Sequence, residues 1–226
     1  MKTSIVIVTY KLPQYLDLCI RSIRMHTKDY ELIVVNNGQD KATLKLLNKY
    51  RNIITINNEE NLGYCKALNQ GVKAASYKMV VLGTNDIIVT PKWLEILRKV
   101  YQVNKPNNPG LIGTYFTYAS GLQDAVRSRW INQPFITKRV ILGCTLTKVK
   151  DFWKVGGMDE NFPNLGGNYA DDDLSRRYWN AGFKNIIAPV LIFHFPSMSY
   201  TSGLLSHHED MKKGEEYYRK KWSDGN

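Results

Sequence analysis

The sequence has no apolar run long enough to cross a bilayer. Its longest apolar stretches, residues 4–8 and 185–195, are about strand length, far below the roughly 20 residues that a transmembrane helix needs. The apolar run behind Met1 is also too short for the hydrophobic region of a secretory signal. We therefore expect no membrane span and a cytoplasmic location.

Cysteine is scarce. Cys19, Cys65 and Cys144 are odd in number, widely spaced and without a Cys-x-x-Cys pair, which argues against a disulfide framework or a zinc site. We expect them to be reduced, mostly buried small residues.

The common phosphate-binding loops are missing too. There is no Gly-x-x-x-x-Gly-Lys-Ser/Thr sequence, and no Gly-x-Gly-x-x-Gly follows the first predicted strand. A nucleotide would have to be held in another way.

Length and composition favour one domain with a basic surface. A chain of 226 residues with 43% apolar content is long enough for one sizeable core and short for two. The net charge of +11 favours an anionic partner, such as a nucleotide diphosphate, lipid head groups or nucleic acid. A solvated basic surface is an equally simple interpretation.

Apolar β-branched runs alternate with segments of helical periodicity through residue 103. This alternation is typical of crossover units and a mostly parallel sheet with helices on both faces, an α/β fold. Residues 106–135 are predicted to be irregular, which is often a mark of functional segments. The predicted strands are 4–9, 31–36, 53–57, 79–82, 140–147 and 186–193, and the predicted helices are 13–23, 42–50, 64–75 and 91–103.

Polar residues follow the predicted strands, at the sheet edge where open α/β sheets bind ligands. They include Thr9-Tyr10, Asn36-Asn37 and Thr84-Asn85-Asp86. A carboxylate at this edge is placed to reach a divalent cation that also binds phosphate oxygens. A turn or capping role before Pro91 is the alternative for Asp86.

Three adjacent carboxylates, Asp171, Asp172 and Asp173, begin a predicted helix. The helix dipole favours negative charge there, so a structural role for one or two of them is the alternative to ligand binding. Successive side chains point about 100° apart around a helix, so the three cannot face one ligand.

Six motifs in this order and spacing resemble family-two GT-A glycosyltransferases over nearly the whole chain. A Tyr-Tyr-Arg-Lys-Lys-Trp sequence at 217–222 resembles the ending of many members. The six motifs are Ser4-Ile5-Val6-Ile7-Val8-Thr9-Tyr10, Asn61-Leu62-Gly63, Asn69-Gln70-Gly71, Thr84 to Leu94, Gly156-Gly157-Met158-Asp159-Glu160 and Asp171 to Leu174.

The resemblance implies a single GT-A domain over 1–226 and a metal-dependent, inverting hexosyltransferase. Its parts would be a nucleotide-sugar-binding half (1–105), an acceptor and catalytic half (106–200) and a helical tail (201–226). The donor would be a UDP-, dTDP- or GDP-linked sugar, and the acceptor a glycan, a lipid-linked or glycolipid molecule, or a protein.

The same resemblance assigns roles to residues. Asp171 is the general base, and Asp86 holds Mn²⁺ or Mg²⁺, with His194 as a further metal contact. The substrate-binding residues are Thr9, Tyr10, Asn36, Lys66, Asn85, Asp159 and Asp172, with Asp159 contacting an acceptor hydroxyl.

Three departures from the family pattern concern the donor and the metal. Asn36 stands where an acidic residue usually contacts the base, and Thr84 stands where a second aspartate is common. Leu68 stands where some relatives have arginine. Lys66 is the nearby residue that would supply the charge, although an exposed lysine is usually just solvated.

Two other functions fit part of the sequence. One is a catalytically silent nucleotide- or carbohydrate-binding module of the same fold, since function does not follow from fold. The other is a nucleic-acid-binding protein, but the only basic and aromatic cluster, residues 211–222, mixes in Glu215 and Glu216. We expect residues 209–222 to form a helix that packs Tyr218 and Trp222 on the domain, with lysines facing solvent or an anionic membrane surface. We expect no nucleic-acid partner.

Overall fold

The first half of the chain forms the alternation that its apolar pattern predicts. The computed structural model describes residues 1–119, 123–125, 132–195 and 198–223. Its elements to residue 107 are β1 (Thr3–Thr9), α1 (Pro13–His26), β2 (Tyr30–Asn37), α2 (Lys41–Leu47), β3 (Ile53–Asn58), α3 (Tyr64–Lys73), β4 (Met79–Thr84), β5 (Ile87–Ile88), α4 (Trp93–Val103) and a short 3₁₀ helix (Lys105–Asn107).

The second half contains more regular structure than the sequence predicts. Its elements are β6 (Pro109–Phe116), β7 (Phe135–Thr137), β8 (Cys144–Lys148), α5 (Val149–Lys154), α6 (Ala170–Asn180), β9 (Lys184–His194), α7 (Met198–Thr201) and α8 (His207–Ser223).

The prediction of an irregular stretch over 106–135 is wrong for β6, which lies inside it. Every residue of β6 is buried, so the strand has no polar face and shows no alternation. Its glycines also hide the pattern, because they serve close packing: a Cβ on Gly110 would lie 2.7 Å from Tyr178 Cδ1. The strand predicted over 140–147 corresponds to β8, which begins later, at Cys144, and is shorter than predicted.

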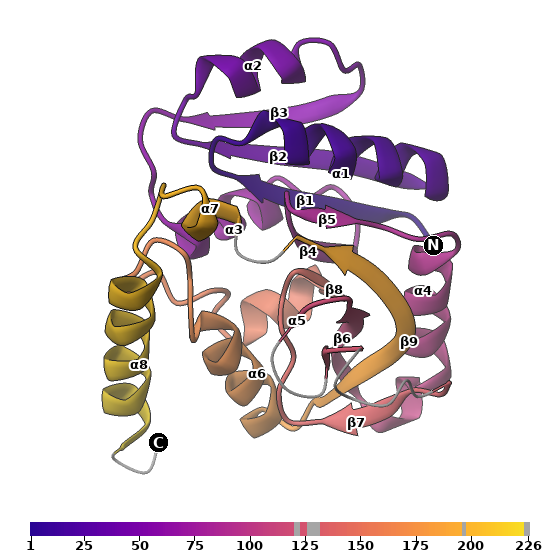
Figure 1. Cartoon of the computed structure of the whole chain (residues 1–226). Helices are drawn as coiled ribbons and strands as arrows, with labels where there is room; N and C mark the ends of the chain where they lie inside the picture. Colours follow the sequence, from indigo (N-terminus) through magenta and orange to yellow (C-terminus); the bar gives the residue numbers. More distant parts are fainter. Residues whose placement is uncertain (120–122, 126–131, 196–197, 224–226) are drawn as a thin grey trace.

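The strands form one mixed sheet in the order β3-β2-β1-β4-β8-β6-β9-β5, with β7 also paired to β9 (Figure 1). The pairs among β3, β2, β1 and β4 are parallel, as is the β6–β9 pair. Strands β8 and β5 run antiparallel to their neighbours β4 and β9. The carboxyl ends of the first four strands therefore meet at one edge of the sheet, as the α/β prediction requires.

Helices cover both faces of this sheet and make a single α/β domain. In β1, Ile5 and Ile7 pack into a core with residues of α1 and α4, whereas Val6 and Val8 pack into a second core with α3 and α6. Cys19, Cys65 and Cys144 are free and buried, as predicted. Within the described ranges, no helix combines the length and the apolar character needed to cross a membrane.

We predict that Gly71→Ala destabilises the domain. Gly71 lets α3 lie directly on β1 and β2, because an added Cβ would lie 2.2 Å from Val6 Cγ1 and 3.1 Å from Val35 Cγ2. Overpacking of this kind costs about 1–3 kcal/mol, which denaturant unfolding would measure. Lys73→Ala, at an exposed position of the same helix, is the control and should change stability by less than about 0.5 kcal/mol. Equal stability of the two variants would contradict this packing argument.

Candidate active site

The candidate site lies at the edge where the parallel strands end. Strand β4 ends at Thr84, and Asp86 follows two residues later. Strand β5 pairs antiparallel with β9 and places Ile87 opposite His194. This pairing brings His194 Nε2 to 3.5 Å from Asp86 Oδ2. Two residues more than a hundred positions apart in the chain are neighbours because two strands pair.

Two cavities meet at this point. The small cavity, about 130 Å³, is bordered by Tyr10, Asn37, Asn61 and Asn85 on the β1–β3 side. The large cavity, about 740 Å³, extends toward Arg139 and the first turn of α6. Both cavities are lined by Tyr64, Thr84, Asp86 and Gly166. We call these four residues the junction.

The junction contains buried oxygen atoms that lack hydrogen-bond partners within the described structure. They are Asp86 Oδ1, Thr84 Oγ1 and the Tyr64 hydroxyl. Buried polar groups are nearly always hydrogen-bonded in folded proteins, so such atoms need an explanation. An anionic ligand with its cation, or solvent, would satisfy them.

His194 is oriented as a metal ligand would be. Its Nδ1 lies 2.8 Å from the Tyr118 carbonyl oxygen, to which only a protonated Nδ1 donates, and this leaves Nε2 facing Asp86. Burial lowers the pKa of His194, but the Asp86 carboxylate outweighs it and holds the pKa above its ordinary value. The two side chains therefore attract each other when no cation is bound. To a cation that does bind, they offer one carboxylate and one imidazole.

A divalent cation would find only part of its coordination here. In the ranges that the structure describes, no group of three or more His, Cys, Asp or Glu side chains is arranged to hold a metal. Asp86 and His194 fit such an ion when a ligand supplies further oxygen atoms, as phosphate groups do for Mg²⁺. A metal bound at the junction would then depend on a phosphate-bearing ligand.

The three aspartates of α6 have three different environments, as helical geometry requires. Asp171 lines the large cavity. Burial first, and then the negative charge of Asp172, raise the pKa of Asp171 to about 7, against the opposing effect of Arg139. A carboxyl group with its pKa near neutrality exchanges a proton readily at physiological pH, the property required of a general base.

Asp172 also lines the large cavity, where it forms an ion pair with Arg139; Arg139 Nη2 is 3.2 Å from Asp172 Oδ2. Its backbone N–H donates to Asp171 Oδ1 at 2.9 Å. Arg139 lies between the predicted irregular stretch 106–135 and the predicted strand 140–147, and no motif marked it. Arg139 is therefore a candidate site residue that the sequence did not reveal.

Asp173 is structural. It is fully buried and accepts hydrogen bonds from Arg177 Nε at 2.8 Å and Trp222 Nε1 at 3.0 Å. The guanidinium of the neighbouring arginine in the chain, Arg176, stacks on the Trp222 ring, 4.2 Å from the ring centroid. Asp173 thus ties α6 to α8, and its side chain is unavailable to a substrate.

Of four other predicted residues, two line the small cavity. Tyr10 and Asn85 line it, and Thr9 Oγ1 accepts a 2.9 Å hydrogen bond from Asn85 Nδ2, so Thr9 supports Asn85 from behind. Asn36 is fully buried, does not border this cavity, and donates to Asn57 Oδ1 at 3.1 Å. The wall residue on β2 is its neighbour Asn37, since successive side chains of a strand point to opposite faces.

Lys66 and Asp159 are not brought to either cavity. Lys66 is exposed on α3. Asp159 follows the turn at Gly156 and Gly157, both with positive φ, and its Oδ2 accepts from Tyr217 Oη at 3.0 Å and Lys221 Nζ at 2.7 Å. Burial raises the pKa of Asp159, but the hydrogen bonds from Lys221 and Asn161 outweigh it and hold the pKa below its usual value. Asp159 is an anchor of α8.

Helix α8 packs as predicted, with one exception. Trp222 contacts Asp173, and the Tyr218 ring lies 5.9 Å from that of Tyr169. Lys212, Lys213 and Lys220 are exposed. Lys221 faces the domain and not solvent: besides Asp159 it lies 2.8 Å from Asp173 Oδ1.

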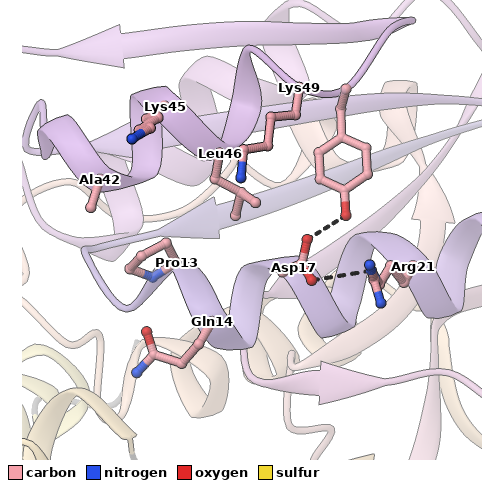
Figure 2. A pocket seen from close by; sticks show the side chains of 9 residues that line it. Pro13, Gln14, Asp17, Arg21, Ala42, Lys45, Leu46 and Lys49 are labelled. Atoms are coloured by element: carbon pink, nitrogen blue, oxygen red, sulfur yellow. Dashed lines mark hydrogen bonds and ion pairs between the residues drawn. The ribbon is translucent and has the colours of Figure 1, made fainter.

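A third cavity of about 550 Å³ lies elsewhere, between α1 and α2 (Figure 2). There Asp17 accepts a hydrogen bond from Tyr50 Oη at 2.5 Å and pairs with Arg21 at 3.1 Å. It contains none of the predicted site residues, so the junction remains the candidate active site.

Comparison with known proteins identifies the family. Residues 4–157 match the family described as Glycosyl transferase family 2. The chain belongs to glycosyl transferase family 2. Its resemblance to this family is thereby confirmed.

Curated relatives match parts of the chain. An uncharacterised glycosyltransferase, YwdF of Bacillus subtilis (strain 168), is 39% identical over 101 residues, which are 44% of this chain and 38% of the relative. The cholesterol galactosyltransferase of Borreliella burgdorferi is 26% identical over 119 residues, which are 51% of this chain and 32% of the relative. The aligned segments span about a third to two fifths of the length of these relatives.

Solved structures confirm the GT-A fold. The mannosyltransferase PcManGT of Pyrobaculum calidifontis, in complex with GDP-Man and Mn²⁺, has a TM-score of 0.73 at 15% identity, over 100% of this chain and 65% of its own. GalNAc-T7 with UDP, GalNAc and Mn²⁺ has a TM-score of 0.71 at 15% identity, over 86% of this chain and 44% of its own. Both are similar in fold, and both contain Mn²⁺ together with a nucleotide or a nucleotide sugar.

Proposed function

We propose that this chain is an inverting, metal-dependent hexosyltransferase that takes a sugar from a nucleotide diphosphate and delivers it to a glycan or glycolipid. The observation that carries the proposal is the junction. Asp86 and His194 lie together there beside buried oxygens that lack partners, and the large cavity leads from this point to Asp171.

The two cavities suggest where each substrate binds. The small cavity, with Tyr10, Asn61 and Asn85, would receive the nucleoside, since an aromatic ring and amide groups suit a base and a ribose. The diphosphate would lie at the junction, against Asp86 and His194. The transferred sugar and the acceptor would then occupy the large cavity, next to Asp171.

This arrangement has the chemistry needed for inversion. Asp171 removes the proton from the acceptor hydroxyl as that oxygen forms a bond to the anomeric carbon on one face. The bond from the anomeric carbon to the diphosphate oxygen breaks on the opposite face, and its electron pair leaves with the nucleotide diphosphate. A divalent cation, when bound at Asp86 and His194, would stabilise the charge that develops on this leaving group.

Support for a glycan or lipid acceptor comes from the relatives. The cholesterol galactosyltransferase has a lipid acceptor in its name, and a poly-β-1,6-N-acetyl-D-glucosamine synthase of Staphylococcus aureus (strain COL) makes a polysaccharide. We include in the proposal a cytoplasmic, peripheral contact of α8 with an anionic membrane, through its exposed lysines Lys212, Lys213 and Lys220.

A screen of nucleotides and nucleotide sugars tests the proposal. The melting temperature of the protein is measured with UDP, GDP and dTDP, each with and without Mn²⁺. At least one nucleotide should raise the melting temperature, and only when Mn²⁺ is present. The matching nucleotide sugars should be hydrolysed slowly in the presence of Mn²⁺. Binding without any donor cleavage would favour the silent binding module, and no binding at all would contradict the proposal.

We predict that Asn36→Asp changes base preference more than turnover. Asn36 precedes Asn37, the last residue of β2 and a wall residue of the small cavity. The Asn36 Oδ1 is buried with no partner among the described residues, so a rearrangement of this strand end on nucleotide binding would bring an acceptor to the base. Affinities for UDP, GDP and dTDP, measured by calorimetry with Mn²⁺, would show the change. Asn57→Asp, at the neighbouring position of β3, is the control. The same ranking of the three nucleotides in wild type and Asn36→Asp would show that Asn36 does not read the base.

A further inference from the structure

The segment between α5 and α6 forms a wall that both substrates would share. Residues 164–169, the wall loop, precede α6 directly. Gly166 lines both cavities, Leu165 lines the small one, and Asn168 and Tyr169 line the large one. The wall loop also leads into Asp171 within two residues. Its position therefore decides both the space for the sugar and the placement of the proposed base.

The wall loop is held from one side by α3. The backbone N–H of Tyr64 donates to the Leu165 carbonyl oxygen at 2.9 Å. Gly167, with a φ of +75°, packs against the Tyr64 ring, where an added Cβ would lie 2.8 Å from Cδ1. Tyr64 thus links the wall loop to the junction.

From the other side the wall loop is held by one carboxylate in the first turn of α8. Asp210 is buried, with 8% exposure. Its Oδ1 accepts from the backbone N–H of Leu165 at 2.9 Å and of Gly166 at 3.2 Å. Its Oδ2 accepts from Asn168 Nδ2 at 2.9 Å, and its backbone carbonyl accepts from Asn164 Nδ2 at 3.1 Å. Hydrogen bonds to an ionised carboxylate are roughly twice as strong as neutral ones.

A glycine in α8 independently supports the close contact between α8 and the wall loop. One turn after Asp210, α8 carries Gly214, a residue that weakens a helix interior. An added Cβ there would lie 2.4 Å from the Asn168 carbonyl oxygen and 2.5 Å from Asn164 Nδ2. Gly214 therefore lets α8 lie directly on the wall loop, at the distance that the Asp210 contacts need.

We propose that Asp210 is a positioning residue of the transferase, which clamps the wall loop between α8 and α3 and so sets the geometry in which the sugar meets Asp171. This inference rests on the proposed function for its catalytic part only. Asp210 lines neither cavity, so it acts through the backbone of Leu165 and Gly166. Because a misplacement of about 1 Å in an active site lowers the rate by about a hundredfold, loosening this clamp should be costly for catalysis.

The first test needs no substrate. Hydrogen–deuterium exchange of the full chain should show the Leu165 and Gly166 amides exchanging about tenfold faster or more in Asp210→Ala, because two charge-assisted hydrogen bonds are lost. Gly214→Ala, which pushes α8 away, should have the same effect in the same peptides. Arg219→Ala, on the exposed face of α8, should leave them unchanged. Equal exchange in wild type and Asp210→Ala would overturn the clamp, whatever the enzyme does.

The second test separates positioning from general stability. With Mn²⁺ and the nucleotide sugar that the wild type hydrolyses fastest, Asp210→Ala should lower kcat about tenfold to a hundredfold. The affinity for the nucleotide diphosphate should stay near the wild-type value, since Asp86, His194 and the small-cavity asparagines lie outside the wall loop. Asp210→Asn should rescue part of kcat, because its amide oxygen still accepts from both backbone N–H groups. Faster exchange with wild-type kcat would overturn the positioning role. If the wild type binds and cleaves no nucleotide sugar, the proposed function fails, and the exchange experiment still decides the clamp.

Discussion

Asp86→Ala should abolish the metal dependence of nucleotide binding. Asp86 is the carboxylate of the junction, its Oδ1 has no partner in the described part of the chain, and His194 alone is a weak site for Mn²⁺ or Mg²⁺. Since a bound cation contributes several kcal/mol to stabilising a developing phosphate charge, we expect donor turnover to fall at least about a hundredfold. Calorimetry of nucleotide diphosphate with and without Mn²⁺, together with a donor hydrolysis assay, measures both effects.

The control for this variant is another carboxylate far from the junction. Asp17→Ala removes the side chain that bonds Tyr50 and Arg21 between α1 and α2 (Figure 2), and it should leave the Mn²⁺ response unchanged. His194→Ala should weaken the Mn²⁺ response less than Asp86→Ala, because the carboxylate carries the charge. Wild-type turnover and a wild-type Mn²⁺ response in Asp86→Ala would eliminate Asp86 as a metal ligand.

Asp171→Asn should bind the donor normally and transfer sugar very slowly. Removal of a general base costs about a hundredfold to ten-thousandfold in rate, and donor binding survives because the base contacts the acceptor and not the nucleotide. The asparagine is nearly the same size and can still accept the hydrogen bond from the Asp172 N–H, so the fold should be unaffected. Turnover and nucleotide affinity, measured on the same preparation, separate these two effects.

The neighbouring aspartates provide the comparison. Asp172→Asn should retain much of the activity, since Asp172 acts beside the base and not as the base. Asp173→Asn should lower stability, because it weakens a buried cluster with Arg177 and Trp222. Near-normal transfer by Asp171→Asn with loss in Asp172→Asn would move the base by one residue.

The pH dependence follows from the same carboxyl group. A general base must be deprotonated, and the pKa of Asp171 is raised to about 7 by burial and by Asp172. In the wild type kcat/KM should therefore fall as the pH drops below about 7, or below a somewhat lower pH when a bound cation adds positive charge to the cavity. Asp172→Asn removes the negative neighbour, so this acidic limb should shift to lower pH. An acidic limb at the same pH in both proteins would contradict the coupling.

Several features of the site could be predicted because they depend on short stretches of chain. The apolar runs and helical spacings through residue 103 predicted β1 to β4 and their helices, and parallel strands place their carboxyl ends at one edge. That alone located Asp86, Tyr10 and Asn85. Helical geometry likewise predicted that Asp171, Asp172 and Asp173 face different surroundings.

What the sequence by itself determined is thus the α/β architecture, the family, and the edge of the sheet where the site lies. Only the tertiary structure decided which side chains meet there. The β5–β9 pairing set His194 beside Asp86, and the packing of α8 assigned Asp159 and Asp173 to anchoring. Arg139 reached Asp172 from the connection between β7 and β8. The reason is physical: the periodicity of apolar residues indicates only the helix or strand to which a residue belongs. These contacts join residues 33 to 108 positions apart, and only the packing of the whole chain brings them together.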